Sequence, residues 1–263
     1  MQTAVDVRGV EKRYGAGTAE EHVAVSDVSF TVARGQTICI VGKTGCGKST
    51  LVNMLLGLIA PTRGQILIDD VDPSTGFMDL RKKIAAVFQT DRLLPWRTVI
   101  DNAALGLEVE GIGRAERHER AREWLAKVGL HRWAGAYPHQ LSGGMRQRAA
   151  IARAFVLDSP VLLLDEAFGH LDEVTAHTLR SDCLSLVSET GKAVILVTHS
   201  IVEALETADT IIVLGRPACV IETLHPAPLR ALPGWQQRRD ALRDEIFRLI
   251  ETRSAEPAIS GLH

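Results

Sequence analysis

A glycine-rich stretch at residues 42–50 constrains the fold of this chain more than any other feature. It reads Gly-Lys-Thr-Gly-Cys-Gly-Lys-Ser-Thr and follows the apolar run Thr37–Val41. It fits the pattern G-x-x-x-x-G-K-[ST], in which a strand leads into a loop whose backbone N–H groups surround a phosphate. The glycines leave the backbone free to curl, and the helix expected from Ser49 onward points its positive end at the same place. The sequence therefore predicts a strand, a loop and a helix that together bind a triphosphate.

The polar residues of this loop have distinct expected roles. Lys48 adds a positive charge for the outer phosphates, and the Ser49 hydroxyl is expected to bind Mg²⁺, the usual partner of a triphosphate. The alternative is a glycine-rich turn that matches by chance, but such a turn does not account for the strand before it and the helix after it. The expected phosphate-binding residues are Gly42, Lys43, Thr44, Gly45, Cys46, Gly47, Lys48, Ser49 and Thr50.

Composition narrows the class of protein. The chain has 263 residues, 46% of them hydrophobic, which is enough for one large domain or for a domain and a subdomain. A formal net charge of −2 argues against a broad nucleic-acid-binding surface. The four cysteines are far apart and lack metal-ligand spacing, so we expect free thiols in a reducing cytoplasm. No apolar run approaches the ~18 residues that span a bilayer, so any membrane role is expected to come through a partner.

The hydrophobic pattern predicts an α/β chain. Alternating residues within Val5–Val32 predict an antiparallel hairpin, and a short apolar strand is expected to end at Gln89. The continuous apolar runs Val161–Leu164 and Ala193–Thr198 are typical of strands buried on both faces of a parallel sheet. Helical periodicity dominates residues 90–157, with one of its helices expected over 103–110, which predicts a helical insertion. A further helix is expected over 174–189, between the last two of these strands.

The end of the chain is expected to form an amphipathic helix. Its apolar positions are Leu242, Ile246, Leu249 and Ile250. Its outward-facing charges are expected to be Arg238, Arg239, Asp244 and Arg248. A closing helix packed on the domain is favoured over a helix that binds a partner.

Two carboxylates follow the buried strand Val161–Leu164. Asp165 and Glu166 stand at its carboxyl end, where the ligands of parallel sheets collect. Asp165 is suited to binding Mg²⁺, and Glu166 to polarising a water in line with a γ-phosphate. A purely structural role is disfavoured because uncompensated buried carboxylates are costly.

A third element is the sequence Leu-Ser-Gly-Gly-Met at 141–145. Ser142 is expected to cap a helix, while Gly143 and Gly144 leave its amino end open to a phosphate. By itself this is only a helix cap. However, it matches four of the five residues of the Leu-Ser-Gly-Gly-Gln signature of the ATP-binding subunits of ABC transporters, and the chain as a whole resembles that family.

The resemblance rests on an ordered set of motifs between residues 5 and 225. The loop, Gln89, the signature, Asp165-Glu166, Leu171-Asp172 and His199 follow one another in the order typical of the family. The resemblance implies that Gln89 contacts Mg²⁺ or the attacking water, that Asp172 communicates across a dimer and that His199 contacts the γ-phosphate. It also implies that Tyr14 stacks on the adenine, although local sequence alone favours ordinary packing for this residue.

The family's architecture and assembly are expected to carry over. The fold class is α/β, a P-loop NTPase (RecA-like) core with a parallel sheet, an N-terminal antiparallel β portion and an inserted α-helical subdomain. The expected bounds are 5–225 for the ATP-binding domain, with its core at 5–89 and 158–225 and the helical subdomain at 90–157. The tail is expected at 226–263.

The resemblance implies a head-to-tail homodimer in which Ser142, Gly143 and Gly144 of one copy face the phosphate loop of the other. It implies hydrolysis of ATP with Lys48, Glu166, His199 and Gln89 as the catalytic residues.

Three residues depart from the family pattern. Met145 replaces the usual glutamine, Ala167 the usual proline, and His170 a small residue. The changes at 167 and 170 are expected to alter loop stiffness and communication across the dimer, and slow hydrolysis in isolation would fit them.

The stretch Leu-Leu-Pro-Trp at 93–96 is similar to the nitrate, sulfonate and taurine importer branch, whereas the approach to Gln89 resembles generic importers. The implied partners are integral membrane permease subunits and, indirectly, a periplasmic or extracellular solute-binding protein. The implied location is peripheral, at the cytoplasmic face of the membrane.

The competing hypotheses for the function of the chain are an exporter ATPase, a non-hydrolysing regulator and a soluble ABC ATPase acting on nucleic acid or ribosomes. The solute cannot be derived from this chain.

Overall fold

The computed structural model describes residues 2–15, 17–18 and 20–253. The described chain divides into two units. The first comprises Met1–Leu80 and Ala193–His263, and the second comprises Arg81–Lys192. The expected helical subdomain, 90–157, falls wholly within the second unit.

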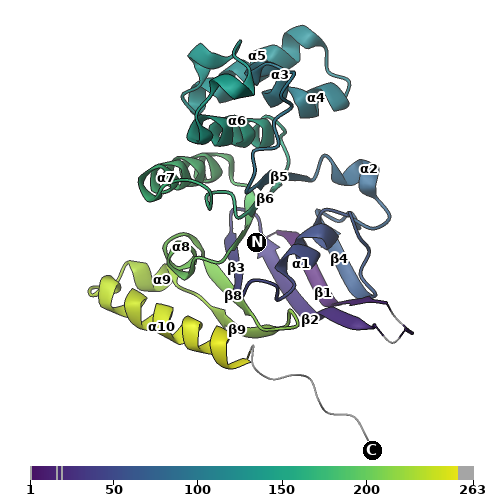
Figure 1. The fold of residues 1–263 in the computed structure, drawn as a ribbon, viewed down its shortest axis with the longest axis vertical. Helices are drawn as coiled ribbons and strands as arrows, with labels where there is room; N and C mark the ends of the chain where they lie inside the picture. The colour runs from purple at the N-terminus through teal and green to yellow at the C-terminus, as the bar shows by residue number, and fades with distance from the viewer. Residues whose placement is uncertain (1, 16, 19, 254–263) are drawn as a thin grey trace, which may run out of the picture. The chain divides into compact units, whose positions relative to one another are not determined.

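The first unit contains an antiparallel sheet with the strand order β2-β1-β4 (Figure 1). Its strands are β1 (Thr3–Tyr14), β2 (His22–Ala33) and β4 (Arg63–Ile68). β1 and β2 form the predicted hairpin. Val5 and Val7 of β1 are buried on either side of the less buried Asp6, as expected for a sheet with one covered face, and the alternation is lost beyond Val7, where the pairing with β2 shifts register.

The first unit also contains the parallel strands that carry the phosphate loop. β3 (Thr37–Gly42) pairs in parallel with β7 (Ala193–Thr198) on one side and with β8 (Thr210–Leu214) on the other. Every residue of these three strands is buried, which accounts for their continuous apolar sequences. β9 (Val220–Leu224) adds an antiparallel strand beside β8.

Five helices of the first unit lie in the described residues. They are α1 (Lys48–Leu55), α2 (Phe77–Leu80), α8 (Ile201–Thr207), α9 (Ala227–Arg230) and α10 (Trp235–Arg253). α10 packs against α8, β8 and β9, as Figure 1 shows in yellow and green. Ile246 is fully buried in this contact, which supports a closing helix. The outward orientation expected for Arg239 is wrong, because its Nη1 lies 3.2 Å from the Glu206 carboxylate of α8.

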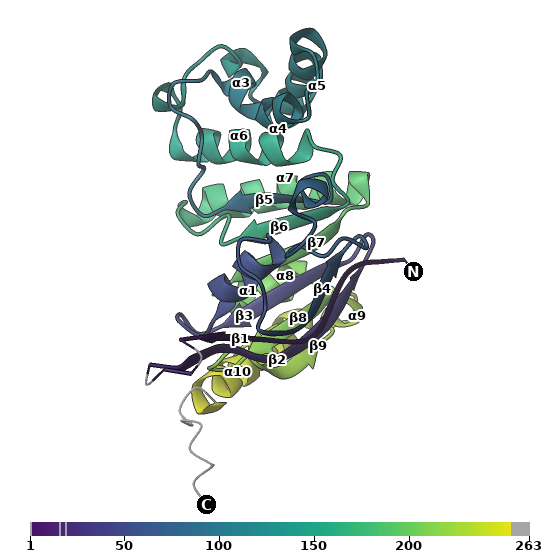
Figure 2. The same cartoon turned by 90° about the vertical axis from the view of Figure 1, so that its right-hand side faces the viewer.

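The second unit pairs β5 (Ile84–Phe88) with β6 (Val161–Asp165) in parallel. Its α-helices are α3 (Val99–Ala103), α4 (Leu105–Val109), α5 (Arg114–Lys127), α6 (Gly143–Phe155) and α7 (Glu173–Thr190), and its 3₁₀ helices are η1 (His131–Trp133) and η2 (Pro138–Gln140). α3, α4 and α5 gather around α6 (Figure 2). The helical region is therefore confirmed, but the helix expected over 103–110 is replaced by α3 and α4, which meet at Ala104.

These strands and helices confirm the predicted α/β class with its antiparallel N-terminal portion. Among the described residues, no helix combines the length and apolar character needed to cross a bilayer.

Candidate nucleotide-binding site

The phosphate loop connects β3 to α1 in the first unit. β3 ends at Gly42 and α1 begins at Lys48, one residue earlier than expected. The Lys48 side chain is almost fully buried, and its Nζ donates to the carbonyl oxygens of Gly42 at 2.7 Å and Lys43 at 3.1 Å. The loop thus holds the ammonium group with its own backbone, so the positive charge sits inside the curve of the loop.

Gly47 is required by both conformation and space. Its φ of 120° is rarely adopted by residues with a side chain, and a Cβ at this position would lie 2.2 Å from the carbonyl oxygen of Ala24. As the residue preceding α1, Gly47 has no side chain with which to cap the helix. The first N–H groups of α1 are therefore left to bind an anion.

His199 leaves the same sheet edge as this loop. β7 ends at Thr198, which is in register with Val41 of β3. The Thr198 Oγ1 donates to the buried Glu203 carboxylate at 2.5 Å and accepts the N–H of Ser200 at 3.0 Å. These contacts fix the backbone on both sides of His199.

Tyr14 lies at the end of β1 and is 42% exposed. The Lys12 Nζ is 5.4 Å from the centre of its ring. The exposed ring is compatible with stacking on a base, which stays a prediction.

The two acidic residues and Gln89 lie in the second unit. Phe88 of β5 is in register with Asp165 of β6, so Gln89 and Glu166 leave their strands at one edge. Glu166 has a φ of 49°, in the left-handed region that strains most residues with a side chain. Gly169 closes a turn by donating its N–H to the Glu166 carbonyl oxygen at 3.0 Å.

Ser142 caps α6 as predicted, because its Oγ accepts the N–H of Met145 at 3.3 Å. Met145 contributes its backbone to this cap, so the replacement of glutamine by methionine leaves the cap intact. Gly143 is exposed, and the amino end of α6 is accessible.

Asp172 caps α7 in the same manner and accepts the N–H of Thr175 at 3.0 Å. The hydrogen bonds from the backbone and the side chain of Thr175 lower the pKa of Asp172.

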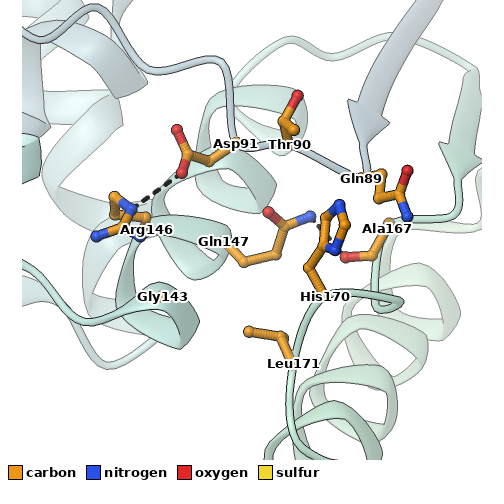
Figure 3. Close-up of a pocket in the computed structure, with 9 residues that line it drawn as sticks. All are labelled: Gln89, Thr90, Asp91, Gly143, Arg146, Gln147, Ala167, His170 and Leu171. Atoms are coloured by element: carbon orange, nitrogen blue, oxygen red, sulfur yellow. Dashed lines mark hydrogen bonds and ion pairs between the residues drawn. The ribbon is translucent and has the colours of Figure 1, made fainter.

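A cavity of about 200 Å³ lies beside Gln89 and α6 (Figure 3). Its lining residues are Gln89, Thr90, Asp91, Gly143, Arg146, Gln147, Ala167, His170 and Leu171. The sequence motifs do not include Asp91, Arg146 or Gln147 as site residues. Arg146 and Gln147 follow the signature directly, and this proximity was the one available signal.

The predicted residues thus form two sets, each within one unit. The first set contains Tyr14, residues 42–50 and His199, and the second contains Gln89, residues 142–144, Asp165 and Glu166. In the described part of the chain, no group of three or more His, Cys, Asp or Glu side chains could hold a metal ion. The roles assigned to these residues stay predictions.

Comparison with known proteins identifies the family. Residues 25–169 match the family model described as ABC transporter. The chain is 38% identical to the taurine import ATP-binding protein TauB of Pseudomonas aeruginosa over 90% of this chain and 93% of that protein. It is 42% identical to the glycine betaine/proline betaine transport system ATP-binding protein ProV of Salmonella typhimurium, over 73% of this chain but 49% of that protein.

Solved structures agree with the fold. A dimeric ATP-binding cassette in a post-hydrolysis state, bound to ADP and phosphate, is similar with a TM-score of 0.75 and 33% identity, over 84% of this chain and 98% of that one. The cbiO1 protein of Clostridium perfringens, part of an ABC transporter complex, is similar with a TM-score of 0.79 and 28% identity, over 95% of this chain and all of that one. These findings confirm the resemblance derived from the motifs, and the chain belongs to the ABC transporter family as one of its ATP-binding ATPases.

Proposed function

We propose that this ATPase drives the import of a small solute of the taurine or betaine class. The observation that carries the proposal is the 38% identity with a taurine import ATP-binding protein, which extends over 93% of that protein. The relative named for betaine transport is matched over less of its length, and therefore supports the class of solute less specifically. The 71% exposed Trp96, within the stretch similar to the taurine branch, is a suitable contact for a membrane subunit.

The residues of the two sets suit the hydrolysis of ATP. Lys48 and the N–H groups of its loop would hold the phosphates. Mg²⁺ prefers oxygen ligands and is typically held by one or two carboxylates together with phosphate oxygens. The Asp165 carboxylate and the Ser49 hydroxyl would each supply an oxygen ligand. Glu166 would polarise the attacking water, with Gln89 and His199 aligning it.

The amino end of α6 is suited to contacting the nucleotide that a second copy of the chain binds. Ser142 caps this helix end through the N–H of Met145, Gly143 is exposed, and one of the similar solved cassettes is a dimer. A head-to-tail pair would place these residues of one copy against the ATP of the other. We further propose membrane permease subunits as partners, a solute-binding protein as an indirect partner, and a peripheral position on the cytoplasmic face of the membrane.

Substitution of Glu166 tests the catalytic assignment. Glu166→Gln should abolish phosphate release from ATP while leaving the dissociation constant of ATP nearly unchanged, because the phosphate loop is untouched. Unmodified ATPase activity in this variant would overturn the assignment.

Uptake of radiolabelled taurine, glycine betaine and nitrate by cells with and without this chain tests the solute class. Uptake of taurine or betaine that depends on the chain supports the proposal. Nitrate uptake alone, or faster solute efflux, would contradict it. If the chain co-purified with ribosomes or nucleic acid in place of a membrane protein, the alternative of a soluble ABC ATPase would be favoured.

A further inference from the structure

Gln147 makes contacts that no motif assigns to it. It lies on α6, is 4% exposed, and its Nε2 donates to the Phe88 carbonyl oxygen at 2.9 Å and to the Ala167 carbonyl oxygen at 2.6 Å. The two hydrogens of one amide group thus bind two segments that are far apart in sequence. Figure 3 shows the side chain extending from α6 towards Ala167, with Gln89 beyond it.

The two carbonyl groups belong to residues that are next in sequence to the predicted catalytic residues. Phe88 precedes Gln89, and Ala167 follows Glu166. The ladder between β5 and β6 ends at the pair Phe88 and Asp165, so beyond it the sheet no longer fixes the distance between the two segments. Gln147 supplies a connection at this point.

The backbone at Glu166 needs such support. Its φ of 49° is a strained conformation, which persists where surrounding contacts hold it. The bond from Gln147 to the Ala167 carbonyl oxygen restrains the peptide group between Ala167 and Phe168, one residue beyond Glu166, and so limits the movement of the backbone that directs the Glu166 carboxylate.

The same helix also holds the segment after Gln89. Arg146 pairs with the Asp91 carboxylate at 3.0 Å, and Arg153 donates to the backbone carbonyl of Asp91 at 2.6 Å. α6 begins at Gly143 and is capped by the signature residue Ser142, so a displacement of its amino end would be transmitted to the segments carrying Gln89 and Glu166.

We propose that Gln147 is a positioning residue that fixes Gln89 and Glu166 relative to one another for attack of water on the γ-phosphate, and links their placement to the signature helix. The inference rests on the proposed roles of those two residues. It predicts that the loss of Gln147 lowers the rate of hydrolysis much more than the affinity for ATP.

Two substitutions of Gln147 in the full chain test this inference. Gln147→Met keeps the length of the side chain but removes both donors, and kcat for ATP hydrolysis should fall about 10–100-fold with little change in the dissociation constant of ATP. Gln147→Glu should be similarly slow at neutral pH, since a carboxylate cannot donate to either carbonyl. As the pH falls the protonated acid regains one donor, so its rate relative to the unmodified protein should rise.

The pH profile is taken as this ratio because the charged or titratable side chains of Asp91, Arg146 and His170 line the same cavity as position 147 in both proteins, and Glu166 precedes its partner Ala167.

Gln36→Met is the matched control. Gln36 also makes two hydrogen bonds, accepting the Ala33 N–H at 2.9 Å and donating to the Thr210 Oγ1 at 3.2 Å, but it precedes β3 at the end opposite the phosphate loop. Its loss should lower the melting temperature and leave kcat unchanged.

The outcomes separate the inference from the proposed function. Full kcat per folded molecule in Gln147→Met, or no recovery of Gln147→Glu at low pH, would overturn the positioning role, while an inactive Glu166→Gln variant would still support the catalytic assignment. Full activity of Glu166→Gln would overturn the assignment and the inference together.

Discussion

At the scale of single residues, the phosphate loop is defined by contacts that its own short sequence determines. The Lys48 Nζ donates to the carbonyl oxygens of Gly42 and Lys43, so the backbone of the loop fixes the position of its charge. Gly45 and Gly47 both have positive φ, but they differ in the space around them. This difference allows the conformational and steric requirements of the loop to be tested separately.

Gly47→Ala should destabilise the protein more than Gly45→Ala. At Gly45 a Cβ meets no atom within 4 Å, so alanine there carries only the cost of the left-handed conformation, about 1–2 kcal/mol. At Gly47 the added carbon would lie 2.2 Å from the Ala24 carbonyl oxygen, and the backbone would have to move. Urea unfolding of both variants measures the two losses, and equal losses would show that the close approach at Gly47 is relieved without cost.

Residues whose role is local could be predicted from sequence, and those with distant partners could not. The phosphate loop and the Ser142 cap depend on neighbours within a few positions, so the spacing of residue types was sufficient. Gln147 binds a carbonyl 59 residues away and another 20 residues away, and the pattern of α6 contains no sign of either. For the same reason the contact of Arg239 with Glu206 was missed.

At the scale of elements, α10 shows how strongly a single apolar position can fix a helix. Ile246 is fully buried and the adjacent Phe247 is 56% exposed. Ile246→Ala should lower the free energy of unfolding by about 2–5 kcal/mol, because it leaves a cavity where α10 packs on the domain. Phe247→Ala is the control and should change it by less than about 0.5 kcal/mol. The reverse order in chemical unfolding would mean that α10 presents its other face to the domain.

The contact between α3 and α5 depends on a charged group. The Asp101 carboxylate of α3 accepts from Thr98 and lies 2.9 Å from the His118 Nε2 of α5. Partial burial raises the pKa of Asp101, but the hydrogen bonds from Thr98 and His118 outweigh this effect and the pKa is lowered overall. The ionised form is therefore favoured by folding.

Asp101→Asn should reduce the free energy of unfolding by about 1–3 kcal/mol at neutral pH, because hydrogen bonds to a charged group are lost. A carboxylate whose pKa is lowered on folding contributes stability above its unfolded-state pKa of about 3.9, and loses it as the pH falls through the folded value. The difference between the two proteins should persist at about pH 5 and close towards about pH 3. Urea titrations across this range measure it, and a difference independent of pH would exclude the ionic contribution.

Element boundaries were predictable where apolar periodicity is long. The helix over 174–189 was expected and α7 spans Glu173–Thr190. The same periodicity did not reveal the break between α3 and α4, because Ala104 has high helix propensity and its backbone stays in the right-handed helical region. The seven-residue α8 was also missed, since it is too short for a periodic pattern.

At the scale of the whole molecule, the accessible amino end of α6 is the feature that supports pairing of the chain with a second copy of itself. The Ser142 Oγ accepts the N–H of Met145 in the first turn of α6, and Gly143 is exposed at the start of the helix. A nucleotide held by the phosphate loop of one copy and by this helix end of another would bridge two chains. Its γ-phosphate would then act as a removable clamp, and dimerisation should depend on both ATP and the signature.

Glu166→Gln with Mg²⁺ and ATP should therefore elute from a sizing column as a dimer, because the variant retains the γ-phosphate. Adding Gly143→Asp should prevent dimerisation without preventing folding or ATP binding. The nearest atom to a Cβ at Gly143 is 3.9 Å away, so the side chain has room, but its negative charge would face the phosphates of the partner's nucleotide. Gly135→Asp is the charge-matched control, since a Cβ there meets nothing within 4 Å and the position lies outside the signature. If the variant with Gly143→Asp dimerised as readily as this control, the signature would not form the second half of the site.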